Sequence, residues 1–398
     1  MISLSTLTIS VTFATNFIIL SLNNNKLKSS KPEFSRIAVK VGSNVITQSD
    51  GSLDSWRISR LVADISTLSK QGIEVVLVSS GAVAAGRSED YPSKKTNIIA
   101  DKQVLAAIGQ VKLMSSYQFL FGKYGLQAGQ VLTTKDSFRD RRHYLNMKNC
   151  ISAMIENHVL PIVNENDTIS INELMFTDND ELAGLISSMM DCESLIILSN
   201  VDGIFKGIPG SIGSELVKEI YGDSDDIEKY ISPSKSEFGR GGMLTKYSIA
   251  RTIASEGIHV FIANGNRDSI ITDIVRRNEV PCTHFIASTR KKNGVKKWLS
   301  HSETFVKGAV IINKGAKDAL FGERATSLLM IGITRIEGYF KKGDIVRILD
   351  ESGTYIGLGK SQYDSKRAEL HLGEKQSKPL IHYDYLVINE KINNGSLV

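Results

Sequence analysis

The chain has 398 residues, which is too long for one average domain and suits a large domain followed by a smaller one. Its 41% hydrophobic and 23% charged residues are typical of a soluble globular protein. The three cysteines lie far apart without metal-ligand spacing, which argues against a disulfide framework or a protein-held metal site and favours a reducing compartment. The net charge of +5 is uneven, because from His284 onward Lys and Arg outnumber Asp and Glu by 19 to 12. This excess fits either a polyanion partner or a solubility device.

Residues 1–32 are predicted to be an N-terminal extension outside the fold. The stretch 4–22 is apolar, but it is interspersed with Ser, Thr and Asn and has neither a basic start nor a convincing cleavage site. It is also too polar for a membrane span. We therefore expect no membrane association.

From Arg36 to about residue 290, short apolar runs alternate with amphipathic stretches of helical length, which is typical of an α/β protein with a largely parallel sheet. The near-continuous hydrophobicity of the runs indicates helices on both faces of the sheet, a three-layer αβα sandwich. The predicted strands are 37–41, 75–78, 160–163, 195–198 and 259–262. The predicted helices are 54–71, 102–123, 142–157, 180–190 and 245–256.

The pattern changes after a polar, basic linker predicted at 291–303, so we place the first domain at 33–290 and a second at 304–392. The second domain has short alternating runs, which predict a small all-β unit. These runs are 310–312, 328–331, 345–349, 355–359 and 385–388, and the turns at 342–344 and 351–353 fit hairpins.

Ligands of open α/β sheets bind beyond the carboxyl ends of the strands. Two lysines near such positions are therefore candidate ligand-binding residues. Lys40 lies inside an apolar strand just before Gly42, where its ammonium is costly unless it meets an anion such as phosphate. A lysine that reaches water from an edge strand is the alternative. Lys246 ends the glycine-rich segment 238–246 at a predicted helix start, although the Walker pattern GxxxxGK[ST] is absent.

Three further segments follow predicted strands. In 78–86 a Ser/Gly turn leads into a helix of tiny residues, which fits an anion site or close backbone packing. Carboxylates and amides crowd 164–167 and 177–181, more than helix capping explains, and favour an ammonium ligand or a magnesium-nucleotide. The third segment, 198–205, follows the predicted strand 195–198. Together these features indicate phosphoryl transfer by positioning and charge neutralisation.

The segments AVKVGSNVIT, VVLVSSGAVAAGR, LPIVNENDTI, TDNDELAGLIS, SNVDGIF and GRGGMLTK resemble the glutamate 5-kinases of the amino-acid kinase superfamily over about residues 34–290. KGAVIINKGAKDAL and GITRIEGYFKKGDIVRI resemble a PUA domain. The resemblance implies an amino-acid kinase fold with a PUA-like barrel. It also implies phosphorylation of the γ-carboxylate of L-glutamate by ATP, with Mg²⁺ carried by the nucleotide, as the first step of proline biosynthesis. A cytoplasmic homo-oligomer is expected, while channelling to the next enzyme is left open.

The resemblance also implies residue roles. Lys40 and Lys246 would neutralise charge around the transferring phosphoryl group, and Asp180 would either hold these lysines or bind the substrate ammonium. Glutamate would be bound by Ser80, Asn164, Asp167 and Asn179. ATP would be bound by Lys40, Ser199, Asn200, Arg240, Gly241, Gly242, Met243, Leu244, Thr245 and Lys246.

The sequence departs from the family pattern at three places on the ATP side, which leaves the nucleotide preference open. These are Ser199-Asn200 for Thr-Asp, Arg240 for a small residue, and 206–210 for an Ala-Asp-Pro-like segment. One alternative is another kinase of the superfamily, acting on carbamate, aspartate, a nucleoside monophosphate or a polyprenyl phosphate. The other is an RNA-binding protein that acts through its PUA-like domain.

Overall fold

The computed structural model describes residues 33–87, 98–169, 176, 179–221, 242–289, 299, 306–322, 326–375 and 378–389. The extension predicted for residues 1–32 lies outside the described residues, as does the predicted linker 291–303 apart from Leu299. The described elements form two large sheets, one in each predicted domain, and a small two-stranded sheet in the first domain.

The first sheet is mainly parallel, as predicted. Its strands are β1 (Arg36–Val41), β2 (Glu74–Ser79), β3 (Gln127–Thr133), β4 (Val159–Glu165), β5 (Ser194–Ser199), β8 (Glu219–Ile220), β9 (His259–Asn264) and β10 (Cys282–Phe285). Within the described part of the chain they are ordered β3-β4-β2-β1-β5-β9-β10-β8, and β10 runs antiparallel to β9. All five predicted strands are present. A separate hairpin pairs β6 (Phe205–Lys206) with β7 (Glu215–Leu216).

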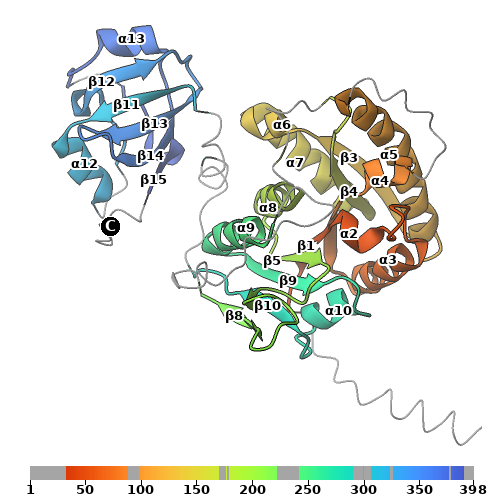
Figure 1. Cartoon of the computed structure of the whole chain (residues 1–398). Coiled ribbons are helices and arrows are strands. Elements are labelled where there is room, and N and C mark those ends of the chain that lie inside the picture. The colour runs from red at the N-terminus through yellow and green to blue at the C-terminus, as the bar shows by residue number, and fades with distance from the viewer. Residues whose placement is uncertain are drawn as a thin grey trace, which may run out of the picture.

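Helices cover both faces of this sheet (Figure 1). The longer ones are α3 (Ser55–Lys70), α5 (Ile98–Gly122), α7 (Arg141–Glu156), α8 (Asn179–Met189) and α9 (Met243–Ser255), which confirms the five predicted helices. The shorter ones are α2 (Ser43–Ile46), α4 (Ala82–Arg87), α6 (Lys135–Arg139) and α10 (Ile270–Val275).

Strand alternation divides the core into two layers. In β1, Ile37, Val39 and Val41 pack with buried residues of α3, α5 and α10. Ala38 points the other way, into a cluster with buried residues of α7, α8 and α9. The sheet is therefore the middle layer of an αβα sandwich.

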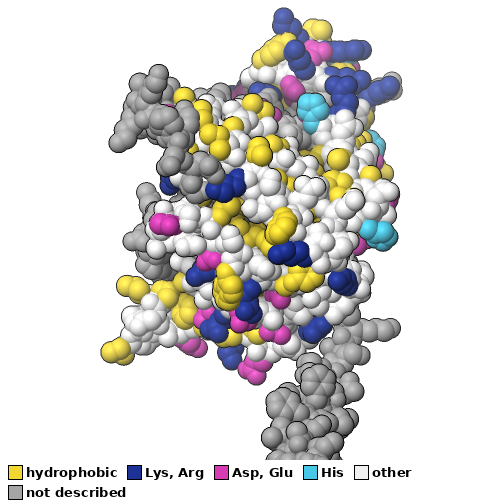
Figure 2. All heavy atoms as spheres, turned by 90° about the vertical axis from the view of Figure 1, so that its right-hand side faces the viewer, with side chains coloured by type: hydrophobic (Ala, Val, Ile, Leu, Met, Phe, Trp, Pro, Cys, Tyr) yellow, Lys and Arg dark blue, Asp and Glu magenta, His cyan; other side chains and the backbone are white. Residues whose placement is uncertain are grey.

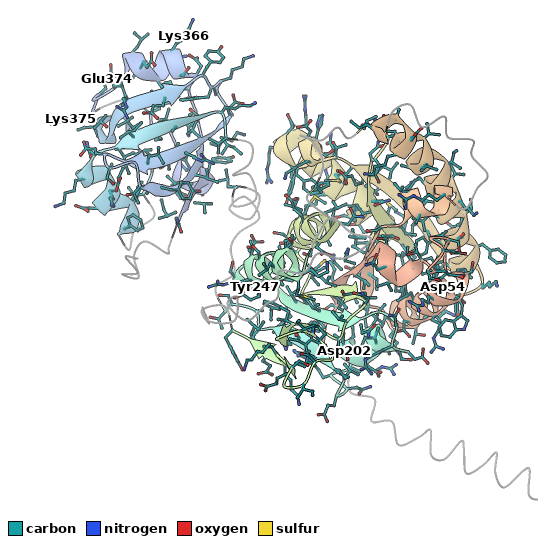
Figure 3. The ribbon with its side chains drawn as sticks, in the orientation of Figure 1. Asp54, Asp202, Tyr247, Lys366, Glu374 and Lys375 are labelled. Carbon is teal, nitrogen blue, oxygen red and sulfur yellow. The ribbon has the colours of Figure 1, made fainter. Side chains whose placement is uncertain are left out.

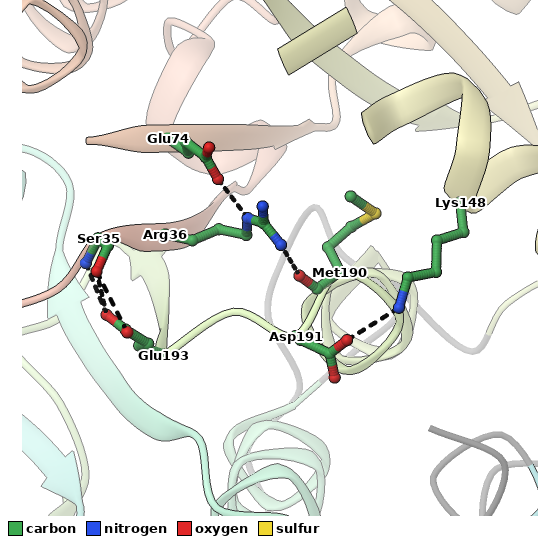
Figure 4. Close-up of polar contacts among 7 residues, drawn as sticks. All are labelled: Ser35, Arg36, Glu74, Lys148, Met190, Asp191 and Glu193. Atoms are coloured by element: carbon green, nitrogen blue, oxygen red, sulfur yellow. Dashed lines mark hydrogen bonds and ion pairs between the residues drawn. The ribbon is translucent and has the colours of Figure 1, made fainter. Parts of the chain in front are cut away.

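The amino end of β1 is held by polar contacts (Figure 4). Arg36 Nε lies 2.5 Å from a carboxylate oxygen of Glu74 on β2, and its Nη1 donates to the carbonyl of Met190 at 2.7 Å. The backbone N–H of Ser35 donates to Glu193 at 2.6 Å. These contacts fix β1 against β2 and against the segment that joins α8 to β5.

The second sheet confirms the predicted small β domain and has the order β12-β11-β13-β14-β15. Its strands are β11 (Gly308–Ile312), β12 (Ile333–Gly338), β13 (Ile345–Asp350), β14 (Tyr355–Lys360) and β15 (Leu386–Ile388). The domain also contains two short helices, α12 (Lys314–Phe321) and α13 (Ser365–Leu370).

Two details of this domain correct the sequence prediction. The apolar run 328–331 is not a strand, because Leu328 forms one isolated bridge to Ile381 and residues 330–332 form a 3₁₀ turn. The turn at 351–353 joins the antiparallel strands β13 and β14, as expected for a hairpin. The turn at 342–344 does not form a hairpin, because β12 and β13 lie on opposite sides of β11.

In the part of the chain that the structure describes, no helix combines the length and the hydropathy needed to cross a membrane.

Candidate active site

Lys40 points into the αβα layer that contains α8 and α9. It shares a face of β1 with Ala38, since side chains two residues apart along a strand lie on one side. Its side chain is only 7% exposed, so its charge needs a partner. A Cβ added to Gly42 would lie 3.3 Å from Lys40 Nζ, which shows that the ammonium group lies over the glycine backbone just beyond β1.

Asp180 is the partner of Lys40 and also of Lys246. It lies in the first turn of α8 and is fully buried. Its Oδ1 is 2.6 Å from Lys40 Nζ and its Oδ2 is 2.6 Å from Lys246 Nζ. Lys246 lies in the first turns of α9, which begins after Gly242. The two lysines that the sequence singled out therefore converge on one carboxylate.

The two ammonium groups determine the charge state of Asp180. Burial raises the pKa of this carboxyl group, but the positive charges of Lys40 and Lys246, together with their hydrogen bonds, outweigh burial and lower its pKa to about 2. Asp180 is therefore ionised at neutral pH and does not accept a proton there. It is suited to holding two cations in fixed positions.

A chain of side-chain hydrogen bonds lies on the β2 and β4 side of this cluster. Asn179 Nδ2 donates to Ser80 Oγ at 2.7 Å and to Asn164 Oδ1 at 3.1 Å. Asn164 Nδ2 in turn donates to Gln110 Oε1 at 2.8 Å. Ser80, Asn164 and Asn179, all predicted to bind substrate, are thus brought together, and Gln110 joins them from α5.

Asp167, the fourth predicted substrate residue, has a cationic neighbour. Its Oδ1 lies 3.2 Å from Lys102 Nζ on α5. Sequence reasoning missed both Lys102 and Gln110, because it treated α5 only as an amphipathic helix. Their positions about two helical turns apart on that helix were the available signal, since such residues share a face.

The predicted nucleotide residues are described in part. Ser199 ends β5 and is mostly buried, and its carbonyl accepts from Gly265 N–H at 2.8 Å. Gly242 is the residue before α9, and Met243, Leu244 and Thr245 form the first turn of that helix. Asn200 is exposed next to Ser199. Arg240 and Gly241 lie outside the described residues.

An ion pair links the loop that follows β5 to the loop that follows β9. Asp202, labelled in Figure 3, receives two hydrogen bonds from Arg267, from Nε at 2.7 Å and from Nη2 at 2.8 Å. This bidentate pair ties the loop after β5 to the loop after β9. Segment 206–210, one of the departures from the family pattern, includes the exposed Ile208 in the β6–β7 connection.

The glycines of the Ser/Gly segment have a packing role. A Cβ at Gly86 of α4 would lie 2.0 Å from the carbonyl oxygen of Leu105, and one at Gly109 of α5 would lie 1.8 Å from that of Ala82. The two helices therefore meet backbone to backbone. Gly81 has φ +105°, which favours glycine, at the turn that follows Ser80. Close packing, one of the two interpretations of these tiny residues, holds for Gly86.

The chain matches known families over both domains. The amino acid kinase family model matches residues 35–264, and the PUA domain model matches residues 308–382. The glutamate 5-kinase of Bacteroides thetaiotaomicron is 55% identical over 359 residues, covering 90% of this chain and 99% of that protein. The glutamate 5-kinases of Chlorobaculum tepidum and Trichlorobacter lovleyi are 48% and 37% identical, covering 90% and 88% of this chain and 98% and 93% of theirs.

The fold and these matches define a member of the amino acid kinase family with a C-terminal PUA domain. Within that family, the chain belongs to the glutamate 5-kinases.

Proposed function

We propose that the protein transfers the γ-phosphoryl group of ATP to the γ-carboxylate of L-glutamate, giving L-glutamyl 5-phosphate and ADP. The observation that carries this proposal is the meeting of Lys40 and Lys246 on the buried Asp180, beside the chain of Ser80, Asn179 and Asn164. Two fixed cations suit a triphosphate, and the amide and hydroxyl groups suit an amino acid.

The lysines would supply charge stabilisation. Negative charge spreads over the oxygens of the phosphoryl group during transfer, and Lys40 and Lys246 would neutralise it. Asp180 would keep the two ammonium groups in place. No general base is required, because the γ-carboxylate of glutamate is already ionised at neutral pH.

Ser80, Asn164, Asp167 and Asn179 would bind glutamate. Ser80 Oγ accepts from Asn179, so its own hydroxyl hydrogen is left to donate to a ligand oxygen. Asp167 would bind the substrate ammonium, in exchange for its 3.2 Å contact with Lys102. This pocket suits an amino acid better than a phosphorylated acceptor.

ATP would bind beyond β5 and the start of α9, next to Ser199, Asn200 and the residues from Arg240 to Lys246. Backbone N–H groups of the first turn of α9, a 13-residue helix, would face phosphate oxygens. Mg²⁺ would enter with the nucleotide as part of the substrate.

The proposed reaction is tested by incubating the protein with ATP, Mg²⁺, glutamate and hydroxylamine, which traps the acyl phosphate as a hydroxamate. We expect glutamate-dependent ADP release with stoichiometric hydroxamate. ADP release that is dependent on aspartate, carbamate or a nucleoside monophosphate instead would contradict the glutamate assignment.

We propose that the protein acts as a cytoplasmic homo-oligomer whose product enters proline synthesis. The face that Figure 2 turns toward the viewer carries hydrophobic side chains among charged ones. On α5, Val111 is 69% and Phe119 is 66% exposed, and they lie two turns apart on one helix face. Sedimentation velocity should give a mass above 43.8 kDa. Channelling to the next enzyme stays a prediction.

RNA binding by the PUA domain also stays a prediction. Lys366 and Lys375 project from this domain, but so does Glu374 (Figure 3). Mixed charges favour weak, salt-sensitive binding at most. A salt titration of binding to structured RNA tests this second activity separately from the kinase reaction.

A further inference from the structure

Gln110 lies at one end of the hydrogen-bonded side-chain chain described above. Its Oε1 accepts from Asn164 Nδ2 at 2.8 Å, while the other end of the chain is Ser80. Gln110 comes from the middle of α5, a helix that contributes none of the substrate residues implied by the family resemblance.

The direction of each amide in the chain is determined by its neighbours. Asn164 Oδ1 accepts from the backbone N–H of Glu165 at 2.9 Å and from Asn179 at 3.1 Å. Asn164 must therefore turn its NH₂ group toward Gln110. Gln110 must accept this hydrogen bond with its Oε1, because two NH₂ groups cannot form a hydrogen bond with each other.

Among the described residues, this arrangement leaves the NH₂ group of Gln110 without an acceptor. Gln110 Nε2 is buried and has no hydrogen-bond partner in the described part of the chain. Buried donors are nearly always bonded, so an orphan beside a substrate pocket indicates a position where a ligand supplies the acceptor.

The strand order shows which end of the substrate this donor faces. Lys40 lies on β1, Ser80 follows β2, and Asn164 lies on β4, which is the second neighbour of β1. Adjacent strands are about 4.8 Å apart, so Asn164 lies roughly 10 Å across the sheet from β1. The carboxylate that reacts must lie near Lys40 and Lys246. The Gln110 end of the chain is therefore left for the opposite end of the acceptor.

We propose that Gln110 Nε2 donates a hydrogen bond to the α-carboxylate of the amino-acid substrate and so contributes to the choice of acceptor. This inference rests on the proposed function. Together, Ser80 near the reacting carboxylate and Gln110 near the α-carboxylate would select substrates whose two carboxylates are separated by the length of glutamate.

Gln110→Glu isolates this role. The new side chain has the same length, and one carboxylate oxygen can still accept from Asn164 Nδ2. Its second oxygen replaces the outward donor with a negative charge, which repels the α-carboxylate of glutamate. Isoglutamine, in which that carboxylate is a carboxamide, can instead donate to it. The γ-carboxylate that reacts is the same in both substrates.

The experiment measures kcat/KM of both substrates for the wild type and the variant. We expect the ratio of glutamate to isoglutamine to fall at least 30-fold in Gln110→Glu, mainly through KM for glutamate, with KM for ATP unchanged. The control is Gln118→Glu, the same change at an exposed position of α5, which should leave the ratio unaltered.

A structural role would give another result. If Gln110 only supports Asn164, both substrates should lose activity equally, and an unchanged ratio overturns the inference. Should Gln110→Glu fail to fold, Gln110→Ala serves instead. It should lower kcat/KM for glutamate at least 10-fold more than kcat/KM for 4-aminobutanoate, which lacks the α-carboxylate. Equal losses in kcat/KM for the two substrates overturn the inference. Wild-type protein that forms no hydroxamate from glutamate rejects the proposed function itself, and the role of Gln110 with it.

Discussion

The ammonium groups of Lys40 and Lys246 each lie 2.6 Å from a different oxygen of Asp180. Lys40 comes from β1 and Lys246 from α9, which lie far apart in the sequence. Without the carboxylate between them, two buried cations at this separation would repel each other. Asp180 therefore holds the two ammonium groups close together before any ligand binds. This is where we propose that a triphosphate needs both positive charges.

Lys246→Ala should lower kcat about 100- to 1000-fold, because it removes one of the two cations that we propose face the transferring phosphoryl group. Glutamate binding should stay detectable by calorimetry, since the residues proposed to bind glutamate are unchanged. Lys148→Ala is the control. Lys148 lies away from the site and forms a surface ion pair with Asp191, with 2.9 Å between Nζ and Oδ2. Unchanged turnover of Lys246→Ala would reject the role of this lysine.

Asp180→Asn should lower kcat by a similar factor and destabilise the protein by about 3–5 kcal/mol, because it leaves two ammonium groups without their counter-charge. Urea unfolding and steady-state kinetics measure the two effects. If Asp180 holds the lysines, the loss in kcat/KM should be equal for glutamate and for glutarate, which lacks the ammonium group. A loss confined to glutamate would show instead that Asp180 binds the substrate ammonium.

The fold was largely predictable because its signals are local. Strands β1, β2, β4, β5 and β9 are buried on both faces and read as continuous apolar runs. Strand β3 was missed because it lies at the edge of the sheet, and its sequence QAGQVLT has mostly partly or fully exposed positions. The run 328–331 was wrongly predicted as a strand because its hydrophobicity reflects burial of Leu328 and Met330 and not sheet pairing.

The arrangement of the candidate site was predictable where its residues follow strands. Lys40, Ser80 and Asn164 lie at carboxyl ends of parallel strands, which must meet at one edge of the sheet. Gln110 and Lys102 could not be found in this way. They reach the candidate site because α5 packs against α4 through Gly109 and Gly86, a tertiary contact that leaves no short motif in the sequence.

Gly109→Ala should destabilise the protein by about 1–3 kcal/mol or more, because its Cβ would lie 1.8 Å from the carbonyl oxygen of Ala82. It should also raise KM for glutamate, since α4 begins two residues after Ser80, which we propose binds glutamate. Gly122→Ala, at the end of the same helix, is the control: its Cβ meets nothing within 4 Å, so its urea midpoint should not fall. Equal midpoints for the two variants would contradict the close contact of α4 with α5.

His284 couples stability to pH at the other end of the sheet. It stacks on Phe261 with centroids 4.2 Å apart, and its Nε2 lies 2.9 Å from His259 Nδ1. Burial, then the neighbouring positive charge of Arg277, lowers the pKa of His284 to about 4, despite the opposing effect of Glu33. The folded protein thus holds this imidazole neutral, while the unfolded chain protonates it near pH 6.5.

Stability from His284 is therefore fully present above about pH 6.5 and is lost as the pH falls toward 4. Between pH 7 and pH 5 we expect a loss on the order of 1 kcal/mol from this group, after allowance for solvent screening. His284→Phe keeps an aromatic ring against Phe261 and removes the titration, so its urea midpoint should fall less between these pH values than that of the wild type. An acid response of His284→Phe equal to that of the wild type would show that the imidazole contributes nothing to it.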